Sequence, residues 1–452
     1  MMNICLYVPK LRGASLTAPM GVLYIASQLI SCGHDVFCVD GRLTDKPVER
    51  ILDYEPDMLC VTATTPAFPD GVRVASAVKA SSQGCVIVFG GAHPTATPQT
   101  VVEYGAVDYV VVGEGEKPMR EIGGGHNPST VNNVCYLNGG YHSNRVNDPL
   151  TPGELDMLPY PAYFLLDLKK YFSRSNSHGL YIKDPRHLPV MSSRGCPNAC
   201  AYCQRMMGYG FRGRSPESVV GEIEYLVGEY GVREIHLEDD NFTHDRSRAV
   251  NILKKLIDLD LGVHLKLSNG MRADKTDPEL FKLLVEAGGY FVGFGVESGS
   301  QRILDEMRKG IKKERVSQAI GEAKDAGLLV GGSFIVGYPG ETYGDVVETI
   351  DFALTNPLDS ASISMLVPFP GTHARSLCEP YARPDYYDFS KYVFLPNEPF
   401  ELFETPELSY RGLCELVKVF HRRFYMRPSF LFKSLGRVTP SQIMRGVVTL
   451  TK

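Results

Sequence analysis

The chain has 452 residues, of which 44% are hydrophobic and 22% are charged, the proportions of an ordinary globular protein. This length allows two or three domains, each with a core of its own. The formal net charge of −5 argues against a dedicated nucleic-acid-binding protein, which would carry a large basic excess. No apolar run reaches the roughly 18 residues that a transmembrane helix needs, and residues 1–9 are typical of a strand rather than of a secretion leader.

Short apolar strands alternate with helices over about the first 120 residues. The expected strands are residues 4–8, 36–39, 58–62, 86–89 and 109–112, and the first expected helix is residues 21–31. Strands that are joined by single helices form a parallel sheet covered on both faces. We therefore expect a doubly wound α/β domain over residues 1–150, with a short hairpin around residues 134–141.

Turn-forming Pro, Gly and Asn residues then interrupt the alternation, and residues 151–185 are interpreted as a linker. A second alternating series follows, with strands expected at residues 190–193, 234–238, 264–268, 290–296, 329–336 and 362–367, and helices such as 216–230 and 276–287. Six strand–helix steps predict a partial β/α barrel over residues 186–375, with its active site at the carboxyl ends of the strands. The last region, residues 376–452, is rich in Tyr, Phe and Pro and then helical.

Eight of the eleven cysteines stand alone, as expected of buried reduced thiols. An odd number of cysteines without a secretion signal is typical of a protein from a reducing compartment, so a cytoplasmic protein is expected. The other three lie within the segment Ser192-Ser-Arg-Gly-Cys-Pro-Asn-Ala-Cys-Ala-Tyr-Cys203.

Cys196, Cys200 and Cys203 follow a predicted strand and can wrap one face of a cubane iron–sulfur cluster. Three protein ligands leave one iron open, where a chelating small molecule can bind through an amine and a carboxylate. Zinc is the alternative, but structural zinc normally takes four protein ligands. His187 and His236 are possible fourth ligands, although nothing in their spacing requires that role.

The Cys-x3-Cys-x-Tyr-Cys pattern resembles the signature of the radical S-adenosylmethionine (SAM) superfamily, in which an aromatic residue such as Tyr202 typically precedes the last cysteine. The resemblance implies a [4Fe–4S] cluster whose open iron holds SAM. One electron, from a donor such as flavodoxin or ferredoxin, then cleaves SAM to a 5′-deoxyadenosyl radical that abstracts a hydrogen atom from a small-molecule substrate.

Later segments extend this resemblance. Gly295-Val-Glu-Ser-Gly299 is similar to a family segment near the SAM ribose, which implies SAM contacts for Glu297 and its neighbour Ser298. The segment Gly332-Ser-Phe-Ile-Val-Gly-Tyr-Pro-Gly-Glu341 is similar to the family segment whose backbone passes the adenine of SAM. The resemblance implies that Gly332 and Gly337 let the backbone approach the adenine closely.

The segment Glu238-Asp-Asp-Asn-Phe-Thr243 stands where many family members have Gly-Gly-Glu. It could hold the SAM amine or face the substrate. The acid–base candidates there are Glu238, Asp239, Asp240 and His244. The alternative is a solvated turn that caps a helix.

Four N-terminal segments resemble the cobalamin-binding branch of the superfamily: Pro19-Met-Gly-Val-Leu-Tyr, Cys32-Gly-His-Asp-Val, Phe89-Gly-Gly-Ala-His-Pro94 and Val112-Gly-Glu-Gly-Glu116. The resemblance implies that this domain binds cobalamin. Ligands of such sheets bind outside the carboxyl ends of the strands, which nominates Thr62, Thr64, Gly90, Gly91, His93, Gly113, Glu114 and Gly115.

Two further motifs are absent. The Asp-x-His-x-x-Gly pattern that supplies a cobalt ligand elsewhere is missing, and His93 is favoured as a structural residue. A Gly-x-Gly-x-x-Gly loop after the first strand is missing as well, so NAD is not expected.

Basic and aromatic side chains alternate between residues 417 and 435. This pattern fits either an interfacial helix that contacts a membrane surface or a helix that caps the barrel mouth with its basic face in solvent or over a substrate, and the second interpretation is favoured.

The expected function is modification of an unactivated carbon in a biosynthetic pathway, and methylation is the commonest reaction of the branch. A dehydratase, cyclase or epimerase acting on a sugar, tetrapyrrole or lipid is the alternative. A metal-binding sensor is a third, non-enzymatic class. The sequence does not reveal the substrate.

Overall fold

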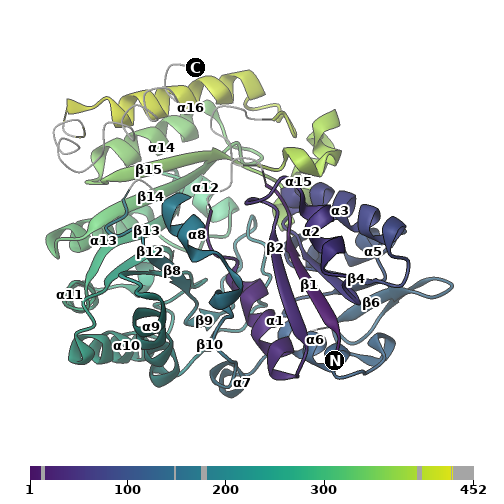
Figure 1. Ribbon diagram of the computed structural model, residues 1–452. Helices are drawn as coiled ribbons and strands as arrows, with labels where there is room; N and C mark the ends of the chain where they lie inside the picture. The colour runs from purple at the N-terminus through teal and green to yellow at the C-terminus, as the bar shows by residue number, and fades with distance from the viewer. Residues whose placement is uncertain (12–15, 147–148, 175–180, 394–399, 429, 431–452) are drawn as a thin grey trace.

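A computed structural model describes residues 1–11, 16–146, 149–174, 181–393, 400–428 and 430. Its strands form two large sheets, and the N-terminal sheet and the later barrel-like sheet lie side by side, with α16 crossing above the latter (Figure 1). The expected α/β fold is confirmed.

The N-terminal sheet has seven strands in the order β2-β1-β3-β4-β5-β6-β7. They are β1 (Asn3–Val8), β2 (Asp35–Asp40), β3 (Met58–Thr62), β4 (Val86–Gly90), β5 (Tyr109–Val111), β6 (Val134–Leu137) and β7 (Tyr141–Ser143). The first five are parallel, and the expected hairpin, β6–β7, continues the sheet antiparallel.

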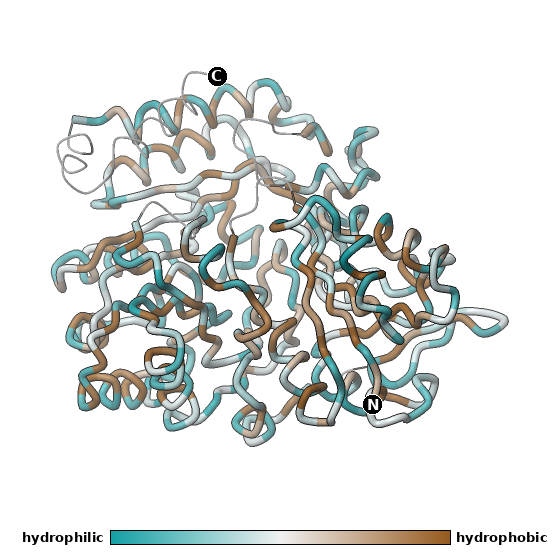
Figure 2. The backbone as a smooth tube through the Cα atoms, viewed as in Figure 1, coloured by the Kyte–Doolittle hydropathy of each residue, from teal (hydrophilic) through white to brown (hydrophobic). Residues whose placement is uncertain are grey.

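Helices cover both faces of this sheet because the strands are apolar on both sides. The helices are α1 (Met20–Ser31), α2 (Pro47–Asp53), α3 (Phe68–Ser81), α4 (Ala92–Ala96), α5 (Pro98–Val102) and α6 (Glu116–Gly123). Leu6 packs in the cluster that contains Val22 of α1, whereas Tyr7 packs in the one that contains Val74 of α3. The strands are correspondingly brown along much of their length in Figure 2. This is the doubly wound arrangement.

The second sheet has six strands, all parallel, in the order β15-β14-β13-β12-β11-β8. They are β8 (His187–Val190), β11 (Glu234–Leu237), β12 (His264–Met271), β13 (Gly289–Glu297), β14 (Leu329–Val336) and β15 (Ser360–Met365). Within the described part of the chain β8 and β15 are the two edges, so the barrel is partial, as expected.

Six helices in the described part of the second half bury their apolar faces in the main core against the outside of the sheet. They are α9 (Pro216–Tyr230), α10 (Arg246–Leu259), α11 (Pro278–Glu286), α13 (Lys313–Asp325), α14 (Tyr343–Thr355) and α16 (Tyr410–Tyr425). Two shorter helices, α12 (Gln301–Glu306) and α15 (His373–Cys378), pack in a separate cluster with Tyr338. Two short helices, α7 (Pro152–Asp156) and α8 (Leu168–Arg174), lie in the segment interpreted as a linker.

The first barrel strand begins earlier than predicted. The expected strand at residues 190–193 is wrong: β8 ends at Val190, and Ser193–Arg194 forms a separate short strand, β9, that pairs with β10 (Arg212–Gly213). Pro189 lies inside β8 and cannot donate to a strand ladder, which restricts it to an edge strand. The proline is tolerated because β8 is an edge strand.

The C-terminal helix α16 packs beside α14 in the outer helix layer of the barrel. The Phe420 ring lies 5.6 Å from the Phe334 ring of β14, and the Tyr425 hydroxyl donates to the Ala361 carbonyl of β15. Basic residues such as Lys418 are exposed on the other side. These contacts anchor α16 to the outside of the sheet through its apolar face and do not place it over the barrel mouth, and the segment after residue 430 lies outside the described residues. No helix in the described ranges is long and apolar enough to cross a membrane.

Candidate active site

The loop between β9 and β10 carries all three clustered cysteines. Gly195 precedes them with φ +80°, and a Cβ there would lie 2.2 Å from the Gly210 carbonyl oxygen, so this position requires glycine. Cys200 is buried, whereas Cys203 is exposed. The Asn198 side-chain amide donates to Cys196 Sγ at 3.1 Å.

Two of the expected acid–base residues hold this loop in place. Asp239 is 2% exposed and accepts hydrogen bonds from the Ser192 backbone N–H (2.6 Å) and from the hydroxyls of Ser192 and Ser193 (2.5 Å each). Asp240 accepts from the Gly195 backbone N–H at 3.0 Å. The carboxylates after β11 therefore fix the chain that leads into the first cysteine.

The surroundings of Cys200 favour its thiolate. A hydrogen bond from the Cys203 thiol lowers the pKa of Cys200 to about 6 against the effect of burial, with help from Lys309 and Arg272. The same bond raises the pKa of Cys203, which keeps the proton. Thiolates are the form that binds metal, so the cations beside Cys200, Lys309 and Arg272, are compatible with an iron–sulfur cluster. Among the described residues, no three His, Cys, Asp or Glu side chains are placed to hold a single metal ion.

Glu297 lies beside this loop, at the end of β13. It has a left-handed backbone (φ +66°), is 7% exposed, and pairs with Lys309 Nζ at 2.8 Å. The same ammonium donates to the Tyr202 hydroxyl at 3.2 Å. Although burial opposes it, Glu297 raises the pKa of Lys309 above its ordinary value. The predicted residues Tyr202 and Glu297 thus meet through Lys309, a residue that no sequence motif indicated.

The other expected SAM-side residues are packed within the barrel. Ser298 is fully buried, and its hydroxyl lies 3.1 Å from the Thr349 hydroxyl. A Cβ on Gly332 would lie 2.9 Å from Leu358 Cδ1. Gly337 has φ +82°, and its backbone N–H donates to the carboxylate of Glu341. Burial raises the pKa of Glu341 to about 8.

Glu238 and His244 lie apart from these residues. Glu238 Oε2 accepts from the Asn269 side-chain amide at 2.7 Å, and the residue lines a cavity inside the barrel. The His244 ring lies 4.8 Å from the Phe211 ring. The four acid–base candidates therefore separate into two that hold the cysteine loop and two that lie elsewhere.

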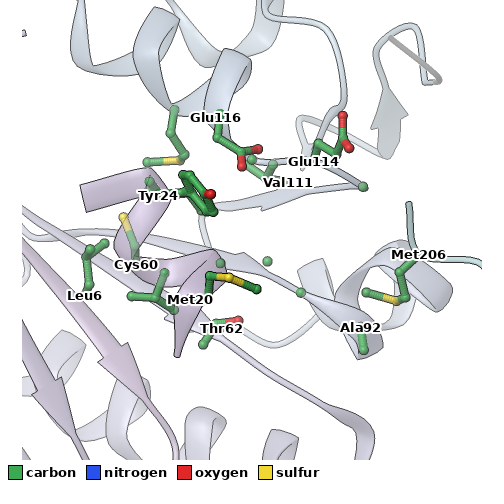
Figure 3. Close-up of a pocket in the computed structure, with 18 of the residues that line it drawn as sticks. Leu6, Met20, Tyr24, Cys60, Thr62, Ala92, Val111, Glu114, Glu116 and Met206 are labelled. Atoms are coloured by element: carbon green, nitrogen blue, oxygen red, sulfur yellow. The ribbon is translucent and has the colours of Figure 1, made fainter. Parts of the chain in front are cut away.

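A cavity of about 300 Å³ lies where the carboxyl ends of β3, β4 and β5 meet the barrel (Figure 3). Met20, Tyr24, Thr62, Glu116 and Met206 surround it. Seven of the residues predicted to bind cobalamin line it together: Thr62, Thr64, Gly90, Gly91, Gly113, Glu114 and Gly115.

Glycines shape the loops at the edge of this cavity. Gly91 has φ +94°, and a Cβ there would lie 2.8 Å from Thr62 Oγ1, so this turn requires glycine for its own packing. Gly113 has φ +76° and no atom within 4 Å of a Cβ position, so its backbone borders open space. Methionines line the barrel side, where Met191, Met206 and Met207 offer apolar, adaptable surface. A bare backbone on one side and thioethers on the other fit the corrin ring of cobalamin.

His93 is not among the residues that line the cavity. Its ring is fully buried, 4.3 Å from Phe68 and 4.5 Å from Phe389, which belongs to the 3₁₀ turn η7 (Phe389–Lys391). Burial and the nearby Arg375 lower the pKa of His93 to about 4. This placement agrees with the structural role that the sequence favoured for His93.

Buried ion pairs connect the cavity to the cysteine loop. Arg194 lies two residues before Cys196, and its guanidinium pairs with Glu116 at 2.7 Å and with Glu114 at 3.3 Å. Arg212 pairs with Glu114 at 2.8 Å and keeps the pKa of this carboxyl low despite its burial. Arg194 stands inside the cysteine motif, yet sequence reasoning gave it no role because its partners lie about 80 residues away.

Comparison with known proteins matches each half of the chain to a family model. A model of the radical SAM superfamily matches residues 190–353, and a model of the B12 binding domain matches residues 12–123. The chain is 32% identical to an uncharacterized methyltransferase of Pyrococcus horikoshii, an alignment that covers 96% of this chain and 95% of that protein. It is 30% identical to the anaerobic magnesium-protoporphyrin IX monomethyl ester cyclase of Rubrivivax gelatinosus, over 91% of this chain and 74% of that protein.

Among solved structures, the fold is similar to that of the radical SAM methyltransferase TsrM of Kitasatospora setae, which was solved with a tryptophan substrate and a SAM analogue. The TM-score is 0.71 with 19% sequence identity, and the match covers 84% of this chain and 76% of that one.

Proposed function

The chain belongs to the cobalamin-binding branch of the radical SAM superfamily, and on that basis we propose that it methylates an unactivated carbon of a small-molecule substrate. It is an enzyme whose cofactors are a [4Fe–4S] cluster, SAM and cobalamin. The observation that carries the proposal is the close connection of the two candidate cofactor sites: Arg194 lines the glycine-rich cavity and lies two residues before the first cysteine.

We assign cofactor contacts to residues as follows. Cys196, Cys200 and Cys203 hold the cluster, and Glu297 orients SAM through the ribose hydroxyls. The loops after β3, β4 and β5 hold cobalamin against the methionines of the barrel. When bound, the cluster supplies the electron that cleaves SAM, and cobalamin supplies the methyl group.

The protein's own groups position these parts and balance their charge. Lys309 compensates the carboxylate of Glu297 and the thiolate of Cys200. Asp239 and Asp240 set the direction of the cysteine loop through bonds to its first residues. Reaction of a radical requires that its partner lie within contact distance, so this positioning contributes directly to the rate.

A cyclase, dehydratase or epimerase is the second candidate function. The observation that favours it is the 30% identity to a magnesium-protoporphyrin ester cyclase across most of the chain. Such reactions use the radical but leave the substrate without an added methyl group.

One experiment separates the two candidates. The protein is purified anaerobically, reconstituted with iron, sulfide and cobalamin, and reduced through flavodoxin or ferredoxin. It is then supplied with cell extract as the source of substrate and with SAM that carries a deuterated methyl group. Small-molecule products are then read by mass spectrometry. A deuteriomethyl product together with 5′-deoxyadenosine supports methylation, whereas 5′-deoxyadenosine with an unlabelled, altered product supports the second candidate and contradicts the first.

We further propose that the enzyme works in the cytoplasm. All eleven cysteines are free thiols in the structure, and an open iron–sulfur cluster requires reducing conditions.

A further inference from the structure

A second cavity, of about 240 Å³, lies on the inner face of the partial barrel. The barrel side is lined by two strands, with His187 and Pro189 from β8 and His236 from β11, followed by Glu238. The other side is lined by the residues that lead into α1, namely Thr17, Ala18, Met20 and Gly21. The N-terminal domain therefore closes the open side of the barrel beside the edge strand β8.

The two cavities share a wall. Met20 and Gly21 line both the glycine-rich cavity assigned to cobalamin and the cavity inside the barrel. The chain that leads into this wall is fixed because Arg42 donates to the Thr17 carbonyl at 2.9 Å. Arg42 is itself paired with Asp40 at 2.6 Å. A molecule in the barrel cavity would thus be next to the cobalamin site.

A carboxylate–histidine pair borders the barrel cavity. Glu234, His236 and Glu238 occupy alternate positions along one extended segment and so point to the same side of the sheet. His236 Nε2 lies 2.8 Å from Glu234 Oε1, and both residues are at most 2% exposed. Glu234 Oε2 accepts from the backbone N–H groups of Lys183 and Asp184, so this carboxylate is fixed.

This pair determines what His236 offers to the cavity. With Nε2–H donated to Glu234, a neutral imidazole presents Nδ1 as a hydrogen-bond acceptor. His187 holds the ring plane, because the two imidazoles are stacked at 4.2 Å and 9°. Burial lowers the pKa of His187 to about 3, so this imidazole is neutral.

Glu238 is the one carboxylate among the described residues that line the cavity, and the Asn269 amide positions it. The other polar residues of the lining are Thr17, His187 and His236, and each of them has an atom that can accept a hydrogen bond. The buried ammonium of Lys266 donates to the Tyr181 carbonyl at 2.8 Å and is not among the residues that line the cavity. A described lining with a carboxylate and no Lys or Arg favours a ligand that donates hydrogen bonds.

We propose that this cavity binds the reacting end of the substrate, and that the substrate there carries a hydrogen-bond donor, a hydroxyl or an ammonium group, received by His236 Nδ1 and Glu238. Glu234 is a positioning residue that acts through His236. The proposal rests on the proposed function, which requires a substrate to lie between the two cofactor sites.

The test uses the full-length protein, reconstituted anaerobically, and three small probes at about pH 8, where imidazole is generally neutral. Ethanolammonium carries two donor groups, acetate is an anion without one at this pH, and ethylene glycol dimethyl ether accepts but cannot donate. Binding is followed by saturation-transfer difference NMR. We expect ethanolammonium alone to bind; absence of its binding, or preferential binding of either other probe, would overturn the inference.

Variants locate the bound probe. Glu238→Gln and His236→Phe should each weaken ethanolammonium binding about tenfold or more, the usual cost of a lost hydrogen bond that involves a charged group. His236→Asn, whose amide oxygen can replace Nδ1, should recover part of the affinity and also guards against a merely misfolded Phe variant. The exposed residues Glu224 and His142 provide matched controls as Glu224→Gln and His142→Phe. Unchanged affinity in Glu238→Gln and His236→Phe would place the probe elsewhere and refute the assignment.

The positioning role of Glu234 has a spectroscopic readout. In protein labelled with ¹⁵N-histidine, the His236 proton should lie on Nε2 in the wild type and be shared between both nitrogens in Glu234→Gln. An unchanged tautomer in the variant would contradict the role. Failure of the proposed function is recognised separately: wild-type enzyme that forms no labelled product but still binds ethanolammonium refutes methylation and leaves the donor-binding cavity standing.

Discussion

At the scale of single residues, the three cysteines and the charges around them determine whether a cluster can form. Lys309 and Arg272 lie close enough to Cys200 to favour its thiolate, and Lys309 also neutralises Glu297. The same cation therefore serves both the cluster ligands and the SAM-side carboxylate.

Cys200→Ala should abolish the broad brown absorbance of the cluster and SAM cleavage together, because two thiolates leave the cluster without its third protein ligand. Ultraviolet–visible spectra and 5′-deoxyadenosine formation measure both. The matched control is Cys32→Ala, at an exposed, isolated cysteine that should retain both properties. Retained SAM cleavage in the Cys200 variant would exclude it as a ligand.

Lys309→Met should leave Glu297 without its cation and make the Cys200 thiolate less favourable. We expect the alkylation rate of Cys200 in the apoprotein to require a higher pH, and SAM affinity in the reconstituted enzyme to fall roughly tenfold. Lys312→Met is the control, since Lys312 is exposed. An unchanged pH profile for alkylation would show that Lys309 does not act on the thiolate.

Glu341 makes stability depend on pH. Burial raises its pKa to about 8, so the folded protein keeps a proton that the unfolded chain releases above its ordinary carboxyl pKa. Because the folded state binds more protons than the unfolded state, the contribution of Glu341 to the free energy of unfolding falls as pH rises from about 4.5 to about 8. Glu341→Gln should gain roughly 4–5 kcal/mol relative to wild type between those two pH values. Urea unfolding at several pH values measures this, and parallel pH curves would contradict it.

At the scale of elements, α16 is attached through one apolar face. Phe420 is fully buried, packs against Phe334 of β14, and stacks on Phe424 at 6.0 Å. Its removal leaves a cavity between this helix and the barrel. The charged face of α16 adds little, since ion pairs at an exposed surface contribute at most about 1 kcal/mol.

Phe420→Ala should therefore lower the free energy of unfolding by about 3–5 kcal/mol. Lys418→Ala, on the exposed face, should change it by less than about 0.5 kcal/mol. Chemical denaturation followed by circular dichroism compares the two. Equal midpoints would mean that α16 is not part of the cooperative fold.

At the scale of the whole molecule, buried ion pairs join the two halves. Arg194, next to the cysteines, pairs with Glu114 and Glu116 of the N-terminal domain. Removing one partner from a buried ion pair is costly because a desolvated charge remains. This connection couples the cobalamin cavity to the cluster loop.

Arg194→Met should destabilise the protein by about 3–5 kcal/mol and weaken cobalamin binding. Combining it with Glu116→Gln should recover part of the loss, which a double-mutant cycle measures. Additive effects of the two substitutions would show that these residues are not coupled.

The sequence alone determined the fold class and the positions of most elements, because apolar runs of strand length and their connections are local signals. Thus α9 and β14 have the predicted bounds, whereas β8 was misplaced because a proline in an edge strand has no local signature. The family was also predicted from local segments, since a cluster loop and glycine-rich turns need particular residues at short spacing.

Only the tertiary structure decided which charges meet. Arg194 with Glu116, Lys309 with Glu297, and Glu234 with His236 beside a cavity become visible when strands and loops far apart in the chain are brought together. Likewise, the fold buried His93 between aromatic rings and turned Asp239 toward the cysteine loop. A short motif indicates which kind of cofactor its residues can bind. The energy of a buried charge depends instead on its partners in space, which the spacing of residues in the sequence does not reveal.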